Sequence, residues 1–94
     1  MREKTALVTW QIVLTKQAFK DAKKLNSAGK RSKVDSLIRI LESNPFLNAP
    51  PYEKLLGDLA GAYSRRISIH HRLVYEVLPR QRTVKIIRMW THYE

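Results

Sequence analysis

Apolar positions in the first third of the chain change from a strand-like run to a helical spacing. Residues 6–14 are rich in Val, Ile and Trp, and we predict a first strand near 10–14. Thr15 then offers a hydroxyl that can cap a helix, and Gly29 offers a place for that helix to end. Between them, apolar side chains recur every three or four residues at Ala18, Phe19, Ala22 and Leu25. This spacing predicts an amphipathic helix.

A second stretch with helical spacing follows directly. Its apolar stripe consists of Val34, Leu37, Ile38 and Leu41. Asn44 precedes Pro45, and a residue before proline avoids the helical region, so we expect the helix to end there. The two adjacent helices are therefore predicted to form a hairpin.

The second half of the chain has the pattern of strands once an irregular stretch has passed. Residues 44–61 contain three prolines and no sustained period, which indicates an irregular connection. Strands are predicted at 63–69, 72–78 and 83–90, joined by two turns into an antiparallel meander. The order strand, helix, helix, strand, strand, strand predicts an α+β fold. Both helices should pack on one face of a mostly antiparallel sheet, with the first strand at an edge or beside the last strand.

The composition indicates a single folded domain without a metal or a cofactor. A length of 94 residues with 44% apolar side chains suits one domain, 1–94, with one core. Without cysteine and with three histidines, a thiolate metal site is excluded and a structural zinc site is not expected, so we predict no metal and no cofactor. No apolar run approaches the roughly 20 residues that span a bilayer, and the start lacks a secretory apolar core. We expect a cytoplasmic protein with no membrane segment.

Charge points to a polyanionic partner. Lys and Arg total 18 against 8 Asp and Glu, a formal net charge of +10. Nucleic acid is the leading candidate, but an acidic protein would satisfy the same field, and a membrane surface is not excluded by charge alone. Four arginines lie on the predicted meander and should gather on its open face or rim: Arg65, Arg66, Arg72 and Arg88. On adjacent strands, Arg65, Arg66 and Arg72 would be crowded and would repel each other, which suggests an anion between them.

Five short motifs then identify a family resemblance. They are Pro50-Pro51-Tyr52-Glu53-Lys54-Leu55, Gly57-Asp58-Leu59-Ala60-Gly61, Tyr63-Ser64-Arg65-Arg66-Ile67, His71-Arg72-Leu73-Val74-Tyr75 and Met89-Trp90-Thr91-His92-Tyr93. Together they resemble the Txe/YoeB toxins of the RelE/ParE toxin superfamily. In the N-terminal half, only the element order and the helix pattern match.

The resemblance implies a fold, a function and partners. The fold would be RelE-like, also called microbial RNase-like. The function would be that of a toxin of a type II toxin-antitoxin system, a metal-independent endoribonuclease that cuts messenger RNA on the ribosome and inhibits translation. A YefM/Axe-like antitoxin is the implied protein partner, besides the ribosome and messenger RNA, and a homodimer is a further partner to consider.

The same resemblance assigns roles to individual residues. The acid/base pair falls on Glu53 and His92, and the central catalytic arginine falls on Arg72. Arg66 matches a phosphate-facing arginine and Tyr93 matches a terminal aromatic residue. These positions are separated widely along the chain, so the resemblance requires the fold to bring them together.

Two further residues belong to the predicted substrate-binding set. Arg65 is included because it is one of the crowded arginines of the meander. A lysine that some family members place three residues after the glutamate is Leu56 here, so Lys54 is the candidate substitute. The sequence leaves open whether Lys54 takes over that role.

These residue types suit the cleavage of RNA without a metal, because the 2′-hydroxyl of the substrate is an internal nucleophile. The Glu53 carboxylate is ionised at neutral pH and can accept the 2′ proton. The planar Arg72 guanidinium can donate two parallel hydrogen bonds to a phosphate. His92 can donate a proton to the leaving 5′ oxygen, and Tyr93 can stack on a base.

Two other functions fit part of the same sequence pattern. One is a RelE/ParE-like toxin without nuclease activity that inhibits DNA gyrase, a branch that need not keep Glu53, Arg72 and His92. The other is a basic nucleic-acid-binding module that uses its charged face alone.

Overall fold

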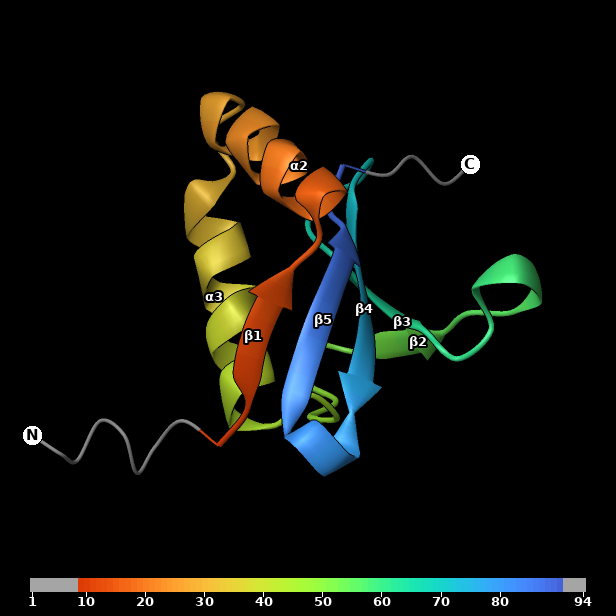
Figure 1. Ribbon diagram of the computed structural model, residues 1–94. Coiled ribbons are helices and arrows are strands. Elements are labelled where there is room, and N and C mark those ends of the chain that lie inside the picture. The colour runs from red at the N-terminus through yellow and green to blue at the C-terminus, as the bar shows by residue number, and fades with distance from the viewer. Residues whose placement is uncertain (1–8, 91–94) are drawn as a thin grey trace, which may run out of the picture.

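Two helices and a five-stranded sheet make up the fold (Figure 1). The computed structural model describes residues 9–90. The strands and helices, in chain order, are β1 (Gln11–Leu14), α2 (Lys16–Ser27), α3 (Arg31–Ser43), β2 (Tyr52–Lys54), β3 (Tyr63–Arg66), β4 (Arg72–Leu78) and β5 (Thr83–Arg88). Short 3-10 turns, η1 at Gly57–Leu59 and η2 at Pro79–Gln81, follow β2 and β4. The α+β class predicted from the sequence is confirmed.

The sheet is mixed, with strand order β1-β5-β4-β3-β2. β1 pairs with β5 in parallel, and every other neighbouring pair is antiparallel. The predicted meander is therefore present as β3, β4 and β5. The first strand was expected at an edge or beside the last strand, and both hold, because β1 is an edge strand that pairs with β5.

The prediction for residues 44–61 as an irregular connection was wrong in one part. Tyr52–Lys54 forms the edge strand β2, which pairs antiparallel with β3. A strand of three residues that directly follows Pro50 and Pro51 is too short to show a period of two, and it is held by its neighbour rather than by its own pattern. The strand predicted at 63–69 ends at Arg66, and the strand predicted at 83–90 ends at Arg88.

The ends of α2 agree with the prediction and connect the helix to the sheet. The Thr15 hydroxyl accepts a hydrogen bond from the Ala18 amide at 3.0 Å, which satisfies one unpaired amide of the first turn. The same hydroxyl donates to the Ile87 carbonyl at 2.7 Å. Gly29, with φ of +77°, takes the left-handed conformation that follows the helix. The start of α2 is thus fixed against β5.

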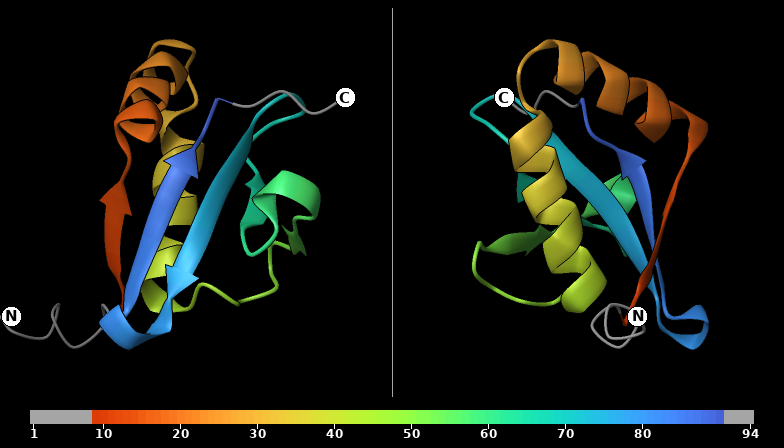
Figure 2. Two further views of the ribbon diagram at one scale, coloured as in Figure 1. Left: turned by 45° about the vertical axis from the view of Figure 1, so that its right-hand side comes forward. Right: turned by 90° about the vertical axis from the view of Figure 1, so that its left-hand side faces the viewer.

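The core lies between the two helices and one face of the sheet (Figure 2). The helices contribute the buried side chains Ala18, Leu25, Val34, Leu37 and Leu41, and the sheet contributes Leu73, Tyr75, Val84 and Ile86. Burial of these apolar surfaces is the main favourable contribution to folding. Both helices lie on this one face, as predicted. Neither α2 nor α3 has the length and apolar character that a membrane-spanning helix needs.

Candidate active site

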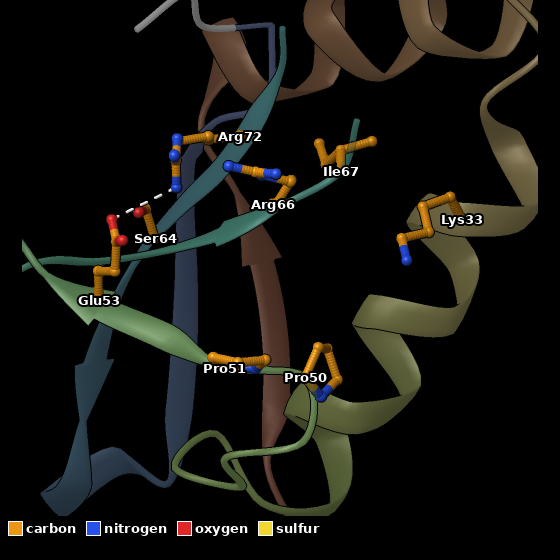
Figure 3. Close-up of a pocket in the computed structure, with 8 residues that line it drawn as sticks. All are labelled: Lys33, Pro50, Pro51, Glu53, Ser64, Arg66, Ile67 and Arg72. Atoms are coloured by element: carbon orange, nitrogen blue, oxygen red, sulfur yellow. Dashed lines mark hydrogen bonds and ion pairs between the residues drawn. The ribbon is translucent and has the colours of Figure 1, made fainter. Parts of the chain in front are cut away.

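A groove of about 380 Å³ lies where β2, β3 and the start of β4 approach the N-terminal part of α3 (Figure 3). Its walls are Lys33, Pro50, Pro51, Glu53, Ser64, Arg66, Ile67 and Arg72. Three of the predicted site residues, Glu53, Arg66 and Arg72, therefore meet at one place although 19 positions separate the first from the last.

Strand register explains this convergence. Glu53 on β2 lies opposite Ser64 on β3, and Arg66 on β3 lies opposite Arg72 on β4. Side chains alternate between the two faces of a strand, so Ser64 and Arg66 point to the same side. Directly opposed residues of an antiparallel pair also share a face. All four side chains consequently project from one surface of the sheet.

Glu53 and Arg72 form a long ion pair in this groove. Arg72 Nη1 lies 3.4 Å from Glu53 Oε1. The Glu53 side chain is 66% exposed and the Arg72 side chain is 22% exposed, so the arginine is the better anchored partner. An exposed pair of this kind contributes only about 0–1 kcal/mol to stability. An anion that binds Arg72 can therefore displace the carboxylate at small cost.

The groove carries an excess of positive charge. Its lining has three cations, Lys33, Arg66 and Arg72, and one carboxylate, Glu53. The guanidinium groups of Arg66 and Arg72 extend toward the same space, with Lys33 on the facing helix (Figure 3). This arrangement suits a phosphate, which accepts several hydrogen bonds from guanidinium groups. Lys33 was missed as a site residue because only the packing of α3 against the sheet brings it there.

Ser64 is, after Lys33, the second polar residue of the groove that was not predicted from the sequence. Its side chain is fully buried, and its hydroxyl has no hydrogen-bond partner among residues 9–90. A smaller hollow of about 150 Å³ is lined by this serine together with Glu53, Leu55 and Arg72. A serine between tyrosine and arginine in a strand gives no local signal of such a position.

Arg65 is buried on the other side of β3, which is inconsistent with its predicted role in substrate binding. Its Nε donates to the Tyr75 hydroxyl at 3.1 Å, and Nη1 donates to the Pro50 carbonyl at 2.7 Å. Nη2 donates to the carbonyls of Pro45 and Leu47 at 2.9 and 2.7 Å. Arg65 has no exposed surface for a phosphate, and it fastens the α3–β2 connection to the sheet instead.

Tyr75 completes this buried cluster. Burial raises the pKa of its hydroxyl, and the nearby positive charge of Arg65 opposes that rise only partly. The hydroxyl therefore stays protonated, and it donates to the Pro45 carbonyl at 3.0 Å while accepting from Arg65. The cluster holds the connection whose continuation, Pro50 and Pro51, forms one wall of the groove.

Lys54 does not line the groove. It follows Glu53 on β2 and pairs in register with Tyr63, so it projects from the opposite face of the strand. The structure therefore gives no support to Lys54 as the substitute for the lysine that is Leu56 here. The other two predicted residues, His92 and Tyr93, lie outside the described residues.

The end of the described chain is held by a buried carboxylate. Asp21 Oδ2 accepts hydrogen bonds from the amides of Met89 and Trp90 at 2.9 and 3.1 Å, and Oδ1 accepts one from Gln17 Nε2 at 2.8 Å. Burial by itself would raise the pKa of Asp21, but these hydrogen bonds and the charge of Arg88 outweigh it and lower the pKa below 3.8. An acidic residue three positions after Ala18 on the apolar stripe was the available signal.

Within residues 9–90, no three His, Asp or Glu side chains gather closely enough to hold a metal ion. The polar groups that line the groove are one carboxylate, two guanidinium groups, one ammonium group and one hydroxyl. These groups can accept a proton and bind a phosphate.

Two helices on one face of a mixed five-stranded sheet, with a basic groove at the far edge, define a small α+β protein with the RelE-like fold. The model of the YoeB-like toxin of bacterial type II toxin-antitoxin systems matches residues 14–93. The chain belongs to this family.

Individual relatives agree with the family match. Toxin YoeB of Streptomyces coelicolor is 38% identical over 61 residues, which cover 65% of this chain and 70% of the relative. The YoeB/ParE toxin from Agrobacterium tumefaciens superposes with a TM-score of 0.79 at 33% identity, covering 88% of this chain and 99% of that one. YoeB from Staphylococcus aureus, solved in a YoeB-YefM complex and as a dimer, gives TM-scores of 0.75 and 0.74 at 33% identity. These two alignments cover 89% and 90% of this chain and 98% and 99% of the S. aureus chain.

Proposed function

We propose that this toxin is a ribosome-dependent endoribonuclease that cuts messenger RNA by attack of the 2′-hydroxyl on the adjacent phosphate. The chain is the toxin component of a type II toxin-antitoxin system, and toxins of its family are generally RNases. The observation that carries the proposal is the convergence of Glu53, Arg66 and Arg72 on one groove. This set supplies a carboxylate that can accept a proton, beside two guanidinium groups that can bind a phosphate.

The proposed reaction needs no external nucleophile. Glu53 takes the proton of the 2′-hydroxyl, and the 2′ oxygen forms a bond to phosphorus while the bond to the 5′ oxygen breaks. The products are a 2′,3′-cyclic phosphate and a free 5′-hydroxyl. Arg72 and Arg66 stabilise the negative charge that builds up on the phosphate oxygens. His92, assigned by its place in the family motif, gives the proton to the departing 5′ oxygen.

The Glu53–Arg72 ion pair fits a resting state of this reaction. In the free protein the carboxylate lies against the guanidinium at 3.4 Å. A phosphate offers Arg72 two oxygens in the geometry of its parallel donors, so it competes well with this long contact to Glu53. Binding of the substrate would then release the carboxylate toward the ribose.

We further propose that the partners are those of the relatives. The S. aureus protein has been solved in a YoeB-YefM complex and as a dimer. A net charge of +10 favours an acidic antitoxin segment that covers the basic groove. An antitoxin of the YefM/Axe type and a homodimer are the corresponding expectations for this chain.

Cleavage on programmed ribosomes tests the proposed function. Purified toxin is mixed with ribosomes that carry an end-labelled message, and new 5′ ends are mapped. We expect cuts within the codon in the decoding site, and we expect Glu53→Gln and Arg72→Ala each to abolish them while the thermal midpoint stays near that of the wild type. Arg80→Ala removes one exposed charge outside the groove and should cut normally.

A single 2′-deoxy substitution at the cut site tests the nucleophile. This change removes the attacking oxygen but leaves the phosphate contacts, so binding should persist and cleavage should stop. Cleavage of the substituted message would exclude 2′-hydroxyl attack. A wild-type protein that binds ribosomes but leaves every message intact would refute the nuclease proposal. Gyrase inhibition or nucleic-acid binding without cleavage would then be the functions to test.

A further inference from the structure

Ser64 presents a buried hydroxyl at the centre of the candidate site. It has no exposed surface, and its Oγ has no hydrogen-bond partner among residues 9–90. Leaving a buried hydroxyl without a partner is costly, and groups in this condition often have a functional reason. In Figure 3, Ser64 is drawn beside the Glu53–Arg72 ion pair, and it lines the same groove as both residues. It also borders the hollow of about 150 Å³ that these two residues line.

Strand register places this hydroxyl within reach of the carboxylate. Ser64 and Glu53 are directly opposed on β3 and β2, and opposed residues have Cβ atoms about 4.5–5.5 Å apart. A glutamate side chain can close that distance by rotation about its own bonds. At present the carboxylate lies against Arg72 instead, with two thirds of its side chain exposed.

A bound phosphate would change the balance between these two positions. The phosphate and the carboxylate are both anions, so they repel each other and compete for the same Arg72 nitrogen. A carboxylate displaced from Arg72 would need another donor if it is to stay in place. Within the groove, Ser64 is a neutral donor opposite Glu53, and it does not compete for the phosphate as a cation would.

We propose that Ser64 is a positioning residue whose hydroxyl donates to the Glu53 carboxylate once an RNA phosphate has taken its place on Arg72. The inference rests on the proposed function and deepens it. One carboxylate oxygen is held by Ser64, and the other is directed toward the 2′-hydroxyl. The hydroxyl, which has no hydrogen-bond partner among residues 9–90, would gain one in the substrate complex.

The test compares Ser64→Ala with the wild type in the ribosome cleavage assay over a range of pH. The variant loses one buried atom that has no hydrogen-bond partner among residues 9–90, so its thermal midpoint should stay equal or rise. Turnover at neutral pH should fall by about 10-fold, the effect of one hydrogen bond to a charged group. KM should change little, because Arg66 and Arg72 remain.

The pH profile separates positioning from packing. A donated hydrogen bond favours the charged form of a carboxylate, so its loss makes Glu53 accept a bulk proton more readily. The acidic limb of the rate profile should therefore move to higher pH by about one unit in Ser64→Ala. Ser68→Ala on the same hairpin removes a hydroxyl outside the groove and should leave both turnover and profile unchanged.

Each outcome decides between the two proposals. If the wild type cuts and Ser64→Ala matches it in turnover and pH profile, the role of Ser64 is refuted while the nuclease stands. A lower thermal midpoint with reduced turnover and an unshifted pH profile would show that Ser64 is a packing residue. This result would also refute its positioning role. If the wild type itself does not cut, the proposed function fails on its own.

Discussion

Two adjacent arginines on β3 have opposite surroundings. Arg65 is fully buried and donates to three backbone carbonyls and a tyrosine hydroxyl, whereas Arg66 is exposed and lines the groove. A guanidinium has five N–H donors in a fixed plane, so it can hold several carbonyls at once in a way that a lysine cannot. The difference follows from strand alternation, which sends neighbouring side chains to opposite faces.

Substitution of these two arginines should separate stability from binding. Arg65→Ala leaves buried carbonyls without donors and opens a cavity, so the free energy of unfolding should fall by about 3–5 kcal/mol. Arg66→Ala should change it by less than about 0.5 kcal/mol but weaken RNA binding. Urea denaturation measures the first effect and filter binding to a short RNA measures the second. A stable Arg65→Ala protein with weakened RNA binding would show that Arg65 binds RNA and does not hold the fold together.

At the scale of elements, Asp21 on α2 fixes the backbone that directly follows β5. The carboxylate on α2 accepts from the two consecutive amides of Met89 and Trp90, directly after the last residue of β5. Trp90 also stacks on His71, with ring centroids 3.9 Å apart. The helix α2, the end of β5 and the β3–β4 turn therefore meet at Met89 and Trp90, the first two residues of the motif that contains His92. The position from which that motif departs depends on a charge within the first helix.

The lowered pKa of Asp21 predicts a pH-dependent contribution to stability. Its folded pKa lies below 3.8, so the stabilisation is fully present above pH 3.8 and is lost as the pH falls through the folded value. Asp21→Asn should lower the free energy of unfolding by about 2–3 kcal/mol at pH 7, since hydrogen bonds to a charged group are lost. The difference between variant and wild type should shrink in strong acid, as denaturant titrations at several pH values would show.

A matched control exists for this measurement on the other helix. Asp35 is 49% exposed and forms an ion pair with Arg31 at 3.6 Å along α3. Because exposed pairs contribute little, Asp35→Asn should change stability by less than about 0.5 kcal/mol at any pH. Equal effects of the two substitutions would mean that the hydrogen bonds of Asp21 do not favour its charged form.

The elements also differ in how well they could be predicted from the sequence alone. Both helices follow from apolar spacing together with Thr15 and Gly29, because a helix carries its pattern in its own residues. β2 was missed, since a three-residue edge strand is defined by its pairing with β3 rather than by a period. Glu53, Arg66 and Arg72 were found through family motifs. Ser64 and Lys33 were not found, because register and helix packing alone bring them to the groove.

The whole molecule combines a strong positive field with the basic groove beside β2 and β3. The charge of +10 is spread over helices and sheet, while the groove concentrates three cations around one carboxylate. A field of this size raises the rate of encounter with any polyanion but does not select one. Under the proposed function, selection would come from the groove, where guanidinium geometry and the carboxylate would favour a ribose phosphate over other anions.

Salt dependence can measure how many of these charges contact RNA. Each phosphate neutralised on a single strand releases counterions, and the slope of log affinity against log salt changes by about 0.7 per contact. If Arg66 contacts a phosphate as proposed, Arg66→Ala should reduce the magnitude of the slope by about 0.7. Arg80→Ala removes an equal charge outside the groove, so it should lower affinity slightly and leave the slope unchanged. Equal slopes for the wild type, Arg66→Ala and Arg80→Ala would show that the general positive field of the molecule holds the RNA. The groove would then not be the RNA-binding site.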